Sequence, residues 1–314
     1  MSLFEKMLVE LPFNREELKI LILTAPQRYK VHFIEKRNGK GKREIAQPTA
    51  EVKLLQRWLV SAVISELPIH NAATAYRLGG SIQKHARPHA AQKYLLKLDF
   101  ENFFPSITAS ALEKHLRQYK HNLPESDIDL LKAVLFKGNR RNGPLTLAIG
   151  APSSPALSNS LLYNFDEAVQ RECDGLKVKY TRYADDLAFS TNVPHILAPL
   201  HARIIEICKE IQYPTLSLNE KKTINLSRKH HRELTGVVLT NGGKISIGHD
   251  NRRLIRAMVD YFARGQLSPQ DVAKLRGLIA FSRSIDPTVV SLVTRRLQAD
   301  QIADLVPGFI QTPD

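Results

Sequence analysis

The chain of 314 residues is 43% hydrophobic and 24% charged, which is typical of a soluble globular protein and excludes wholesale disorder or a collagen-like repeat. Its 45 Lys and Arg exceed its 31 Asp and Glu and give a formal charge of +14, so we expect a polyanionic partner, most commonly a nucleic acid. No apolar run reaches the ~18 residues of a membrane-spanning helix, so we expect no membrane partner. The only two cysteines, Cys173 and Cys208, form no metal-ligand pattern and are too few for a disulfide scaffold, which predicts reduced thiols in a cytoplasmic protein.

The N-terminal part predicts a helix, a basic hairpin and a second helix. Residues 15–25 read as a short helix. Alternating residues 29–33, the turn sequence NGKGK and the segment 43–46 predict a β-hairpin. Seven Lys or Arg against one acid over residues 28–43 make this hairpin strongly basic. Apolar residues recur at helical spacing over 51–67.

Predicted strands and helices then alternate up to residue 248, and only the helical period remains after it. The predicted strands cover 94–100, 176–183, 187–191, 216–226, 237–239 and 244–247. The predicted helices cover 110–119, 126–136, 152–173, 197–211, 250–264, 269–283 and 287–305. The sequence therefore predicts an α+β fold that ends in a helical module.

Two acidic sites lie where carboxylates need a positive partner. Asp99 ends the apolar strand 94–100, so its neighbours draw it toward the core, where an unpaired carboxylate is costly. Asp185 and Asp186 lie side by side at the tip of a hairpin between two apolar strands, and adjacent carboxylates repel each other. Each site alone can also be ordinary structure, because Asp is common in turns.

Taken together in a basic chain, the two sites suggest a pair of Mg²⁺ ions. Mg²⁺ takes oxygen ligands and usually keeps waters and substrate phosphates in its shell. Two ions roughly 3.5–4 Å apart can activate an attacking hydroxyl and stabilise a leaving pyrophosphate.

The tetrapeptide Tyr183-Ala184-Asp185-Asp186 resembles the catalytic box of reverse transcriptases, and the other boxes of that family appear in the same order. They are the fingers motif RNGKGKREIAQP at 37–48, the first catalytic motif LDFENFFPSI at 98–107, the template/nucleotide motif at 150–159, the Lys motif at 218–223 and the primer-grip hairpin at 239–248. The resemblance spans residues 28–283 and implies a right-hand polymerase fold. The implied parts are an N-terminal helix and fingers at 1–92, a palm at 93–248 with finger elements around 110–150, and a helical thumb at 249–314.

Two further signatures resemble those of bacterial retron reverse transcriptases. Residues 85–89 (HARPH) resemble the retron N-A-x-x-H signature, with His85 in place of Asn, and residues 234–236 (LTG) resemble the V-T-G triplet, with Leu234 in place of Val. The basic run 221–232 is expected to contact the RNA backbone. The residues expected to bind RNA are Ala86, His89, Thr235, Gly236, Arg228 and Lys229.

The resemblance implies roles for the residues around the acidic sites. Asp99, Asp185 and Asp186 would hold two Mg²⁺ ions, which Mn²⁺ could replace, with the Phe100 carbonyl as a further ligand. The residues expected at the incoming dNTP are Arg43 and Lys40 or Lys42 at the triphosphate, Lys222 near the leaving pyrophosphate, and Phe104, whose ring would fill the place of a ribose 2′-OH.

The implied partner is one folded non-coding RNA that serves as both template and primer. The retron resemblance implies that synthesis starts from a guanosine 2′-OH and gives a branched RNA–DNA product. It also implies that the DNA product and the enzyme act with a toxic effector protein in phage defence.

Two alternatives stay open at this point. Ile149 stands where the family usually has Gln, and an aliphatic residue there is typical of diversity-generating reverse transcriptases, whereas Pro155 is the ordinary ending of the motif. A catalytically inactive polymerase-fold subunit that binds RNA would explain the charge and the helices equally well, but it has no need of three clustered carboxylates.

Overall fold

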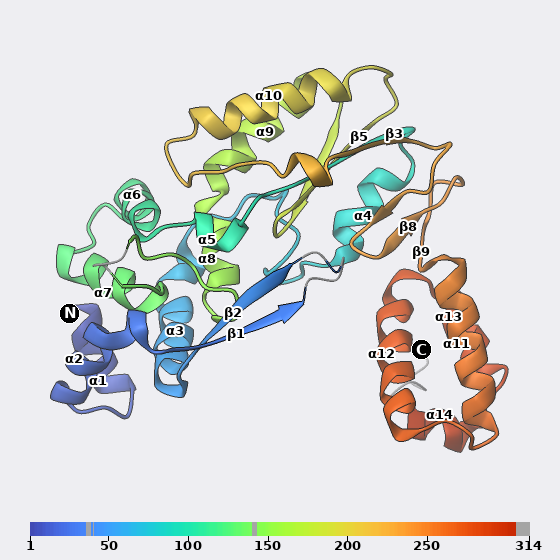
Figure 1. The fold of residues 1–314 in the computed structure, drawn as a ribbon, viewed down its shortest axis with the longest axis horizontal. Helices are drawn as coiled ribbons and strands as arrows, with labels where there is room; N and C mark the ends of the chain where they lie inside the picture. Colours follow the sequence, from blue (N-terminus) through green and yellow to red (C-terminus); the bar gives the residue numbers. More distant parts are fainter. Residues whose placement is uncertain (36–38, 40, 140–142, 306–314) are drawn as a thin grey trace. The chain divides into compact units, whose positions relative to one another are not determined.

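A computed structural model describes residues 1–35, 39, 41–139 and 143–305, which divide into two compact units (Figure 1). The first unit comprises Met1–Gly80, Leu96–Phe189 and Pro194–Asn225, and the second comprises Ser81–Leu95, Ser190–Val193 and Leu226–Asp314. The predicted palm–thumb boundary at residue 248 thus lies within the second unit, and the three-part division stays a prediction. No helix among the described residues has the length and apolar character needed to cross a bilayer.

The N-terminal part of the first unit consists of helices and one hairpin. Asn14 and Glu17 form a capping box, in which the Asn14 side chain accepts from the Glu17 N–H at 2.9 Å and the Glu17 carboxylate accepts from the Asn14 N–H at 3.0 Å. The antiparallel pairing of residues 29–35 with 42–48 confirms the predicted hairpin. The elements are α1 (Leu3–Glu10), α2 (Arg15–Thr24), η1 (Ala25–Gln27), β1 (Tyr29–Glu35), β2 (Lys42–Pro48), α3 (Ala50–Ala62) and η2 (Ile64–Glu66).

A four-stranded sheet in the order β4-β5-β3-β6 carries the acidic residues. Its two inner strands are apolar on both faces, since Leu95, Leu96 and Leu98 of one and Leu187 to Phe189 of the other are all buried. Continuous apolar runs of this kind are expected of strands that are covered on both sides. The strands are β3 (Tyr94–Asp99), β4 (Lys179–Tyr183), β5 (Asp186–Thr191) and β6 (Ile224–Ser227).

Helices supply the rest of the first unit. α9 packs against β4, and α10 packs against α9 (Figure 1). The buried residues Leu157, Leu161, Phe165 and Val169 recur at spacings of four along α8 and α9, which explains why this stretch is helical. The helices are α5 (Phe103–Ser106), α6 (Ala109–Tyr119), α7 (Glu125–Leu135), α8 (Ser154–Leu161), α9 (Tyr163–Gly175), α10 (Leu197–Glu210) and η3 (Glu220–Lys222).

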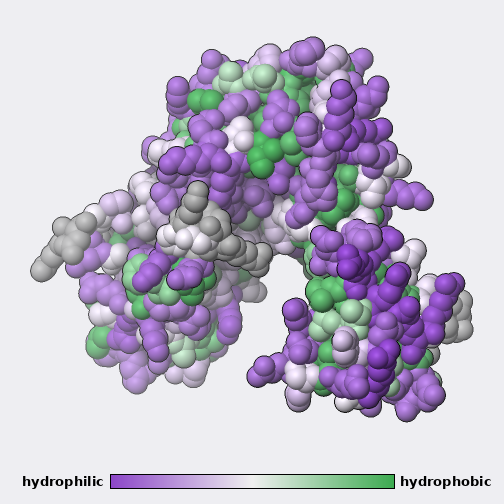
Figure 2. All heavy atoms as spheres, turned by 45° about the vertical axis from the view of Figure 1, so that its right-hand side comes forward, coloured by the Kyte–Doolittle hydropathy of each residue, from purple (hydrophilic) through white to green (hydrophobic). Residues whose placement is uncertain are grey.

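The second unit joins a small sheet to a helical module. Its three strands lie in the order β7-β8-β9, and α4 packs against β8 and β9. The helical module packs around Ile255, Val259, Leu275, Ile279 and Val293, which are all buried. On the face seen in Figure 2, hydrophilic side chains predominate, as a charge of +14 leads one to expect. The elements are α4 (Ile82–Ala90), β7 (Glu233–Leu234), β8 (Val237–Leu239), β9 (Ile245–Ser246), α11 (Gly248–Ala263), α12 (Pro269–Ile285), α13 (Thr288–Thr294) and α14 (Ala299–Leu305).

The structure interrupts several of the predicted elements. The predicted helix 152–173 is two helices that meet at Leu162, where ψ is 4°. The predicted helix 287–305 is interrupted after α13, where the chain turns and buries Leu297. The predicted strand 216–226 is wrong, because a 3₁₀ turn occupies residues 220–222 and only β6 follows it as a strand. Apolar periodicity alone reports none of these interruptions.

Candidate active site

Two of the three predicted carboxylates lie at the ends of adjacent inner strands of the four-stranded sheet, and the third lies in the turn before one of these strands. Asp99 is the last residue of β3, Asp185 lies in the turn after β4, and Asp186 begins β5. The turn is tight because Ala184, which is buried, adopts a left-handed conformation with φ of 57°. Since β3 and β5 are neighbours in the sheet, the end of one and the beginning of the other bring the acidic residues to the same edge.

Backbone hydrogen bonds fix the end of β3 between the acidic turn and the segment before η3. The Phe100 N–H donates to the Asp185 carbonyl at 3.2 Å. On the other side, the Asn219 N–H donates to the Asp99 carbonyl at 2.7 Å, and the Glu101 N–H donates to the Ser217 carbonyl at 2.8 Å. The positions of the carboxylates are therefore set by the backbone and not by flexible side chains alone.

The electrostatics of the site are those of crowded carboxylates. Burial raises the pKa of the Asp185 carboxyl, and the negative charge of Asp99 raises it further. Burial also raises the pKa of Asp186 to about 6, with the charges of Asp185 and Asp99 as the next causes. A bound cation would offset both the energetic cost of burying the charged carboxylates and their mutual repulsion. This is the electrostatic situation expected at a site for a divalent metal.

The metal ligands are not arranged as a closed cage of protein groups. Among residues 1–35, 39, 41–139 and 143–305, no three His, Cys, Asp or Glu side chains converge on one point. Mg²⁺ does not require such a cage, because it is usually held by one or two carboxylates together with waters and substrate phosphates. The donor set, which consists of carboxylate oxygens, fits Mg²⁺ or Mn²⁺ in its chemistry.

Two of the predicted basic residues act on this site. The Lys222 ammonium donates to both oxygens of the Asp99 carboxylate, at 2.8 and 2.9 Å. Arg43, which is exposed on β2, is near enough to lower the pKa of Asp185, although burial outweighs its effect. Lys42 is exposed on the same strand, while the predicted triphosphate residue Lys40 lies outside the described residues.

The aromatic pair after Asp99 divides into a core residue and an accessible one. The Phe103 ring is buried and stacks on Phe100, with centroids 5.6 Å apart and an interplanar angle of 11°. The Phe104 ring contacts Phe103 edge-on and is only half-buried. Of the two, Phe104 is thus the ring with a face left for a ligand, as the predicted role in sugar selection requires.

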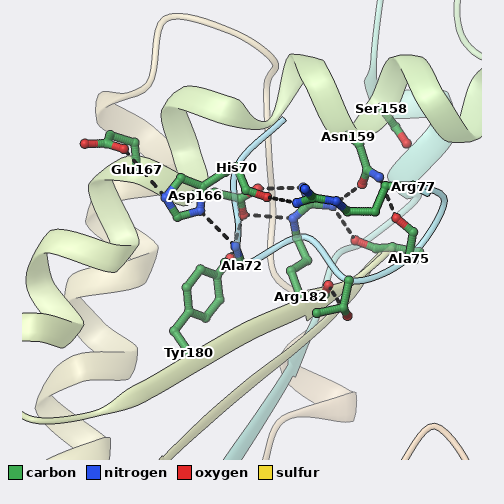
Figure 3. Close-up of polar contacts among 12 residues, drawn as sticks. His70, Ala72, Ala75, Arg77, Ser158, Asn159, Asp166, Glu167, Tyr180 and Arg182 are labelled. Atoms are coloured by element: carbon green, nitrogen blue, oxygen red, sulfur yellow. Dashed lines mark hydrogen bonds and ion pairs between the residues drawn. The ribbon is translucent and has the colours of Figure 1, made fainter. Parts of the chain in front are cut away.

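A buried polar network lies behind the acidic turn, and sequence reasoning did not find it (Figure 3). Arg182 of β4 and Asp166 of α9 are both fully buried and form a two-point ion pair, with nitrogen–oxygen distances of 2.8 and 2.6 Å. The Tyr180 hydroxyl donates to the same carboxylate at 2.7 Å. The other side of the Arg182 guanidinium donates to Asn159 at 3.2 Å and to the Ala184 carbonyl at 3.1 Å. The network therefore holds the turn that carries Asp185.

The template/nucleotide motif contributes to this network through Asn159. Its amide donates to the Ala75 carbonyl at 2.6 Å, so it ties the loop before α4 to α8. The carbonyl of Ile149, the residue that replaces the usual Gln, accepts from the Ala46 N–H at 2.8 Å and joins the motif to β2.

The predicted RNA contacts at Ala86 and His89 need correction. Both side chains lie on α4 and have no exposed surface. His89 forms a hydrogen bond of 2.6 Å with Ser190, and burial, followed by the neighbouring His85, holds the pKa of His89 well below its usual range. A neutral, buried imidazole cannot contact an RNA phosphate, so Ala86 and His89 contribute to the packed interior of the second unit. The exposed basic residues of α4 are Lys84 and Arg87.

Thr235 and Gly236 form a two-residue turn between β7 and β8. Both have positive φ, 46° and 85°, and Leu234 pairs with Val237 across the turn. Two consecutive left-handed residues are the signature of a type I′ hairpin turn. Gly236 is exposed and Thr235 half-buried, so the turn is open to a partner, and its role in RNA recognition stays a prediction.

The two predicted RNA contacts in the basic run, Arg228 and Lys229, differ in their surroundings. The Lys229 side chain is exposed. The Arg228 guanidinium donates to the backbone carbonyls of Ala91 and Gln92, the second at 3.2 Å. Arg228 therefore joins the basic run to the end of α4, and an RNA phosphate would have to share a guanidinium that is already occupied.

The chain is similar to known reverse transcriptases along most of its length. The sequence profile of the family "Reverse transcriptase (RNA-dependent DNA polymerase)" matches residues 34–239. Retron Ec83 reverse transcriptase of Escherichia coli is 39% identical over 283 residues, which cover 89% of this chain and 90% of that protein. Retron Ec73 reverse transcriptase of Escherichia coli is 32% identical over 287 residues, which cover 88% and 89%. Among solved structures, apo telomerase from Candida tropicalis aligns with a TM-score of 0.49 at 10% identity, over 90% of this chain and 61% of that one.

The matched residues 34–239 include all three carboxylates, Lys222 and the network behind them, and relatives of similar length match nearly end to end. This decides against the diversity-generating alternative. It also supports the predicted right-hand polymerase fold and RNA-directed DNA polymerase activity. The chain belongs to the reverse transcriptase family and, within it, to the retron reverse transcriptases.

Proposed function

We propose that this reverse transcriptase copies part of one cognate, structured non-coding RNA into DNA, with two Mg²⁺ ions at Asp99, Asp185 and Asp186. The observation that carries the proposal is the group of mutually repelling carboxylates at the ends of β3 and β5, with Asp99 buried and Asp185 and Asp186 half-buried, next to the cations of Lys222 and Arg43. An inactive RNA-binding subunit gains nothing from such a costly arrangement.

The residues of the site divide the chemistry between them. When bound, the Mg²⁺ ions would lower the barrier for attack of a hydroxyl on the α-phosphorus of a dNTP and stabilise the leaving pyrophosphate. Asp99 and Asp185 would hold the ions, with Asp186 and the Phe100 carbonyl in support. Lys222 is held at Asp99 by its two hydrogen bonds and can turn toward the pyrophosphate, where its charge stabilises the developing negative charge.

Substrate selection is assigned to residues around the carboxylates. Arg43 would grip the triphosphate, and its planar guanidinium is suited to two-point binding of phosphate oxygens. The half-buried Phe104 ring would occupy the space of a ribose 2′-OH, so that dNTPs are preferred to rNTPs. Lys40 is proposed as a second triphosphate ligand on sequence grounds alone.

The retron relatives support a finer proposal about the partner. The RNA would act as both template and primer, with a guanosine 2′-OH as the first attacking group and a branched RNA–DNA molecule as the product. The open Thr235–Gly236 turn and Lys229 are the proposed RNA-facing groups, together with Lys84 and Arg87 of α4. Action with a toxic effector in phage defence belongs to the same proposal, as does a cytoplasmic location, where Cys173 and Cys208 stay reduced thiols.

An incorporation assay with purified protein, a primed RNA template, dNTPs and Mg²⁺ tests the catalytic assignment. We expect Asp185→Asn to reduce DNA synthesis by at least about a thousandfold while RNA binding stays near that of the wild type, because metal charge is lost but the fold is kept. Normal synthesis by this variant would show that the carboxylate assignment is wrong. Sequencing of the nucleic acid that copurifies with the wild type tests the proposed partner: a single RNA linked to DNA through a 2′-branched guanosine is expected.

A further inference from the structure

Tyr76 lies close to the acidic turn and has an unusual backbone conformation. Its backbone is left-handed, with φ of 55°, a conformation that bulky residues rarely adopt. The residue is 45% exposed, so burial of the ring does not account for the conformation. Its ring is 6.4 Å from that of Tyr183, centroid to centroid, at an interplanar angle of 42°. Tyr183 in turn is two residues before Asp185.

The residues before Tyr76 in its loop are hydrogen-bonded to β4. The Arg182 N–H donates to the Ala72 carbonyl at 2.7 Å. The Arg182 carbonyl accepts from both the N–H and the hydroxyl of Thr74, at 2.8 and 2.9 Å. The loop thus runs along β4 like a further strand and brings Tyr76 to the catalytic turn.

Further contacts fix the loop next to and beyond Tyr76. The Ala75 carbonyl accepts from the buried Asn159 amide at 2.6 Å, which anchors the residue directly before the tyrosine (Figure 3). On the C-terminal side, Arg77 donates to the His70 carbonyl at 3.1 Å and closes the loop. Gly80 approaches the loop so closely that a Cβ on it would lie 2.5 Å from the Thr74 carbonyl oxygen. Tyr76 is therefore held in place from both sides by contacts that do not involve its own ring.

The surroundings of Tyr76 define what the ring can contact. Burial raises the pKa of the Tyr76 hydroxyl, and the negative charges of Asp185 and Asp186 raise it further. The side chain is thus a neutral phenol at physiological pH and is close to the carboxylates that would bind the metal. An exposed side chain on a firmly held loop, with a strained backbone and next to reacting groups, is typical of a residue that contacts substrate.

We propose that Tyr76 is a substrate-contacting residue of this polymerase, and that its ring stacks on a nucleobase at the growing end of the template–primer duplex. The inference rests on the catalytic assignment of Asp185. An aromatic face binds any base by stacking and reads no sequence, which suits an enzyme that must advance along its template. The pre-set backbone conformation means that little ordering of the loop is needed when the duplex binds.

The chain offers a matched set of variants. Tyr76→Phe keeps the ring and removes the hydroxyl. Tyr76→Ala removes the ring but leaves a non-glycine residue at the same φ, so the backbone strain is retained. Leu78→Ala removes a fully exposed side chain from the same loop and serves as the control.

The first experiment measures the Kd of a DNA primer annealed to an RNA template by fluorescence anisotropy, with thermal unfolding and dNTP incorporation in parallel. We expect Tyr76→Ala to weaken template–primer binding about tenfold, the usual effect of losing one aromatic–base stack, and Tyr76→Phe and Leu78→Ala to bind within about twofold of the wild type. Binding of Tyr76→Ala at wild-type strength, or failure of Tyr76→Phe to restore it, would overturn the proposal. Incorporation by the wild type in the same assay reports on the polymerase assignment separately.

A second experiment does not depend on any variant folding. Primers or templates carry 5-iodouracil at single positions near the primer terminus, and illumination of the wild-type complex crosslinks the base to a nearby aromatic side chain. A crosslink mapped to Tyr76 from the primer terminus or from its partner base supports the proposal. Crosslinks from these positions that map only to other residues overturn it.

Discussion

Arg182 and Asp166 form an ion pair without any exposed surface, and the same guanidinium donates to the carbonyl of Ala184, the residue before Asp185. The pair thus links α9, through Arg182, to the turn that carries Asp185 and Asp186. Two charges are stable in the interior only when their hydrogen-bonding groups are satisfied, and here Tyr180 and Asn159 supply further partners. The position of the turn is therefore coupled to the packing of the core.

We predict that Asp166→Asn lowers the free energy of unfolding by about 3–5 kcal/mol, because it leaves the Arg182 charge buried without a counter-ion. Urea denaturation followed by circular dichroism measures the change. The control is Arg171→Ala on the same helix, which removes an exposed ion pair with Glu167 at 3.0 Å and should cost less than about 1 kcal/mol. Equal effects of the two variants would mean that burial of the pair contributes nothing.

We predict that Asp186 lowers the free energy of unfolding of the metal-free protein in a pH-dependent way. Its pKa is about 6 in the folded state against an ordinary value of 3.8, so the folded state binds the proton more tightly than the unfolded state does. Stability from this group is therefore greatest at low pH and is lost as the pH rises from about 4 through 6. Asp186→Asn removes the loss and should stabilise the metal-free protein at pH 8 by about 1–3 kcal/mol, with little effect at pH 4.

Urea denaturation at the two pH values, in the presence of a chelator, measures this effect. Asp129→Asn is the control, since Asp129 is an exposed residue paired with Lys132 on the surface of α7. A gain that is the same at pH 4 and pH 8 would show that the carboxylate is not under the strain inferred for it. Protons and Mg²⁺ compete for the same oxygens, so DNA synthesis at limiting Mg²⁺ should also fall as the pH drops below about 6.

Phe104→Ala should admit ribonucleotides. Removing the half-buried ring opens the space for a 2′-OH without a change at the carboxylates, and we expect the preference for dNTP over rNTP to fall by about 10- to 100-fold. Competition between labelled dNTP and rNTP on one RNA template measures the ratio. Phe104→Tyr retains a ring and should keep the preference. If the ratio does not move in Phe104→Ala, another side chain excludes the hydroxyl.

Neutralising two adjacent residues of the basic run, Arg228 and Lys229, should have different effects on RNA binding and on stability. Lys229→Gln is expected to weaken RNA binding and to reduce the slope of log Kd against log salt by about 1, because one phosphate contact is lost from an exposed side chain. Arg228→Gln should instead lower the melting temperature, since its guanidinium bonds the Ala91 and Gln92 carbonyls. Salt titrations of RNA binding, together with thermal melts, separate the two effects. A reversed pattern would make Arg228 the phosphate ligand.

The Thr235–Gly236 turn gives a separate test of RNA choice. Replacing Thr235 with a bulkier residue should impair priming on the cognate RNA and spare extension of a DNA primer annealed to a generic RNA template, because the turn has one exposed residue, Gly236, and carries none of the three carboxylates. The two activities are measured with the same preparation. Equal loss of both would show that the turn acts only as a structural element of the β7–β8 hairpin.

The sequence by itself determined the parts of this protein that depend on local pattern. The basic hairpin of β1 and β2 and the strand–turn–strand around Asp185 follow from short-range alternation and turn residues, and the structure has both. The order of the sequence motifs indicated the family, which the family match over residues 34–239 shows. The helical period after residue 249 likewise predicted helices, although not the break after α13.

The tertiary structure alone decided which side chains are available. Asp166 appears on a helix like any surface acid, and only long-range packing brings Arg182 to it; His89 appears in a motif that suggests an RNA contact, and only packing shows that it is buried. Tyr76 has no local pattern to mark it, because its position depends on Arg182 and Asn159, which are 106 and 83 residues away along the chain. Sequence period reports which face of an element is apolar, whereas burial of a particular polar group depends on what other elements pack against it.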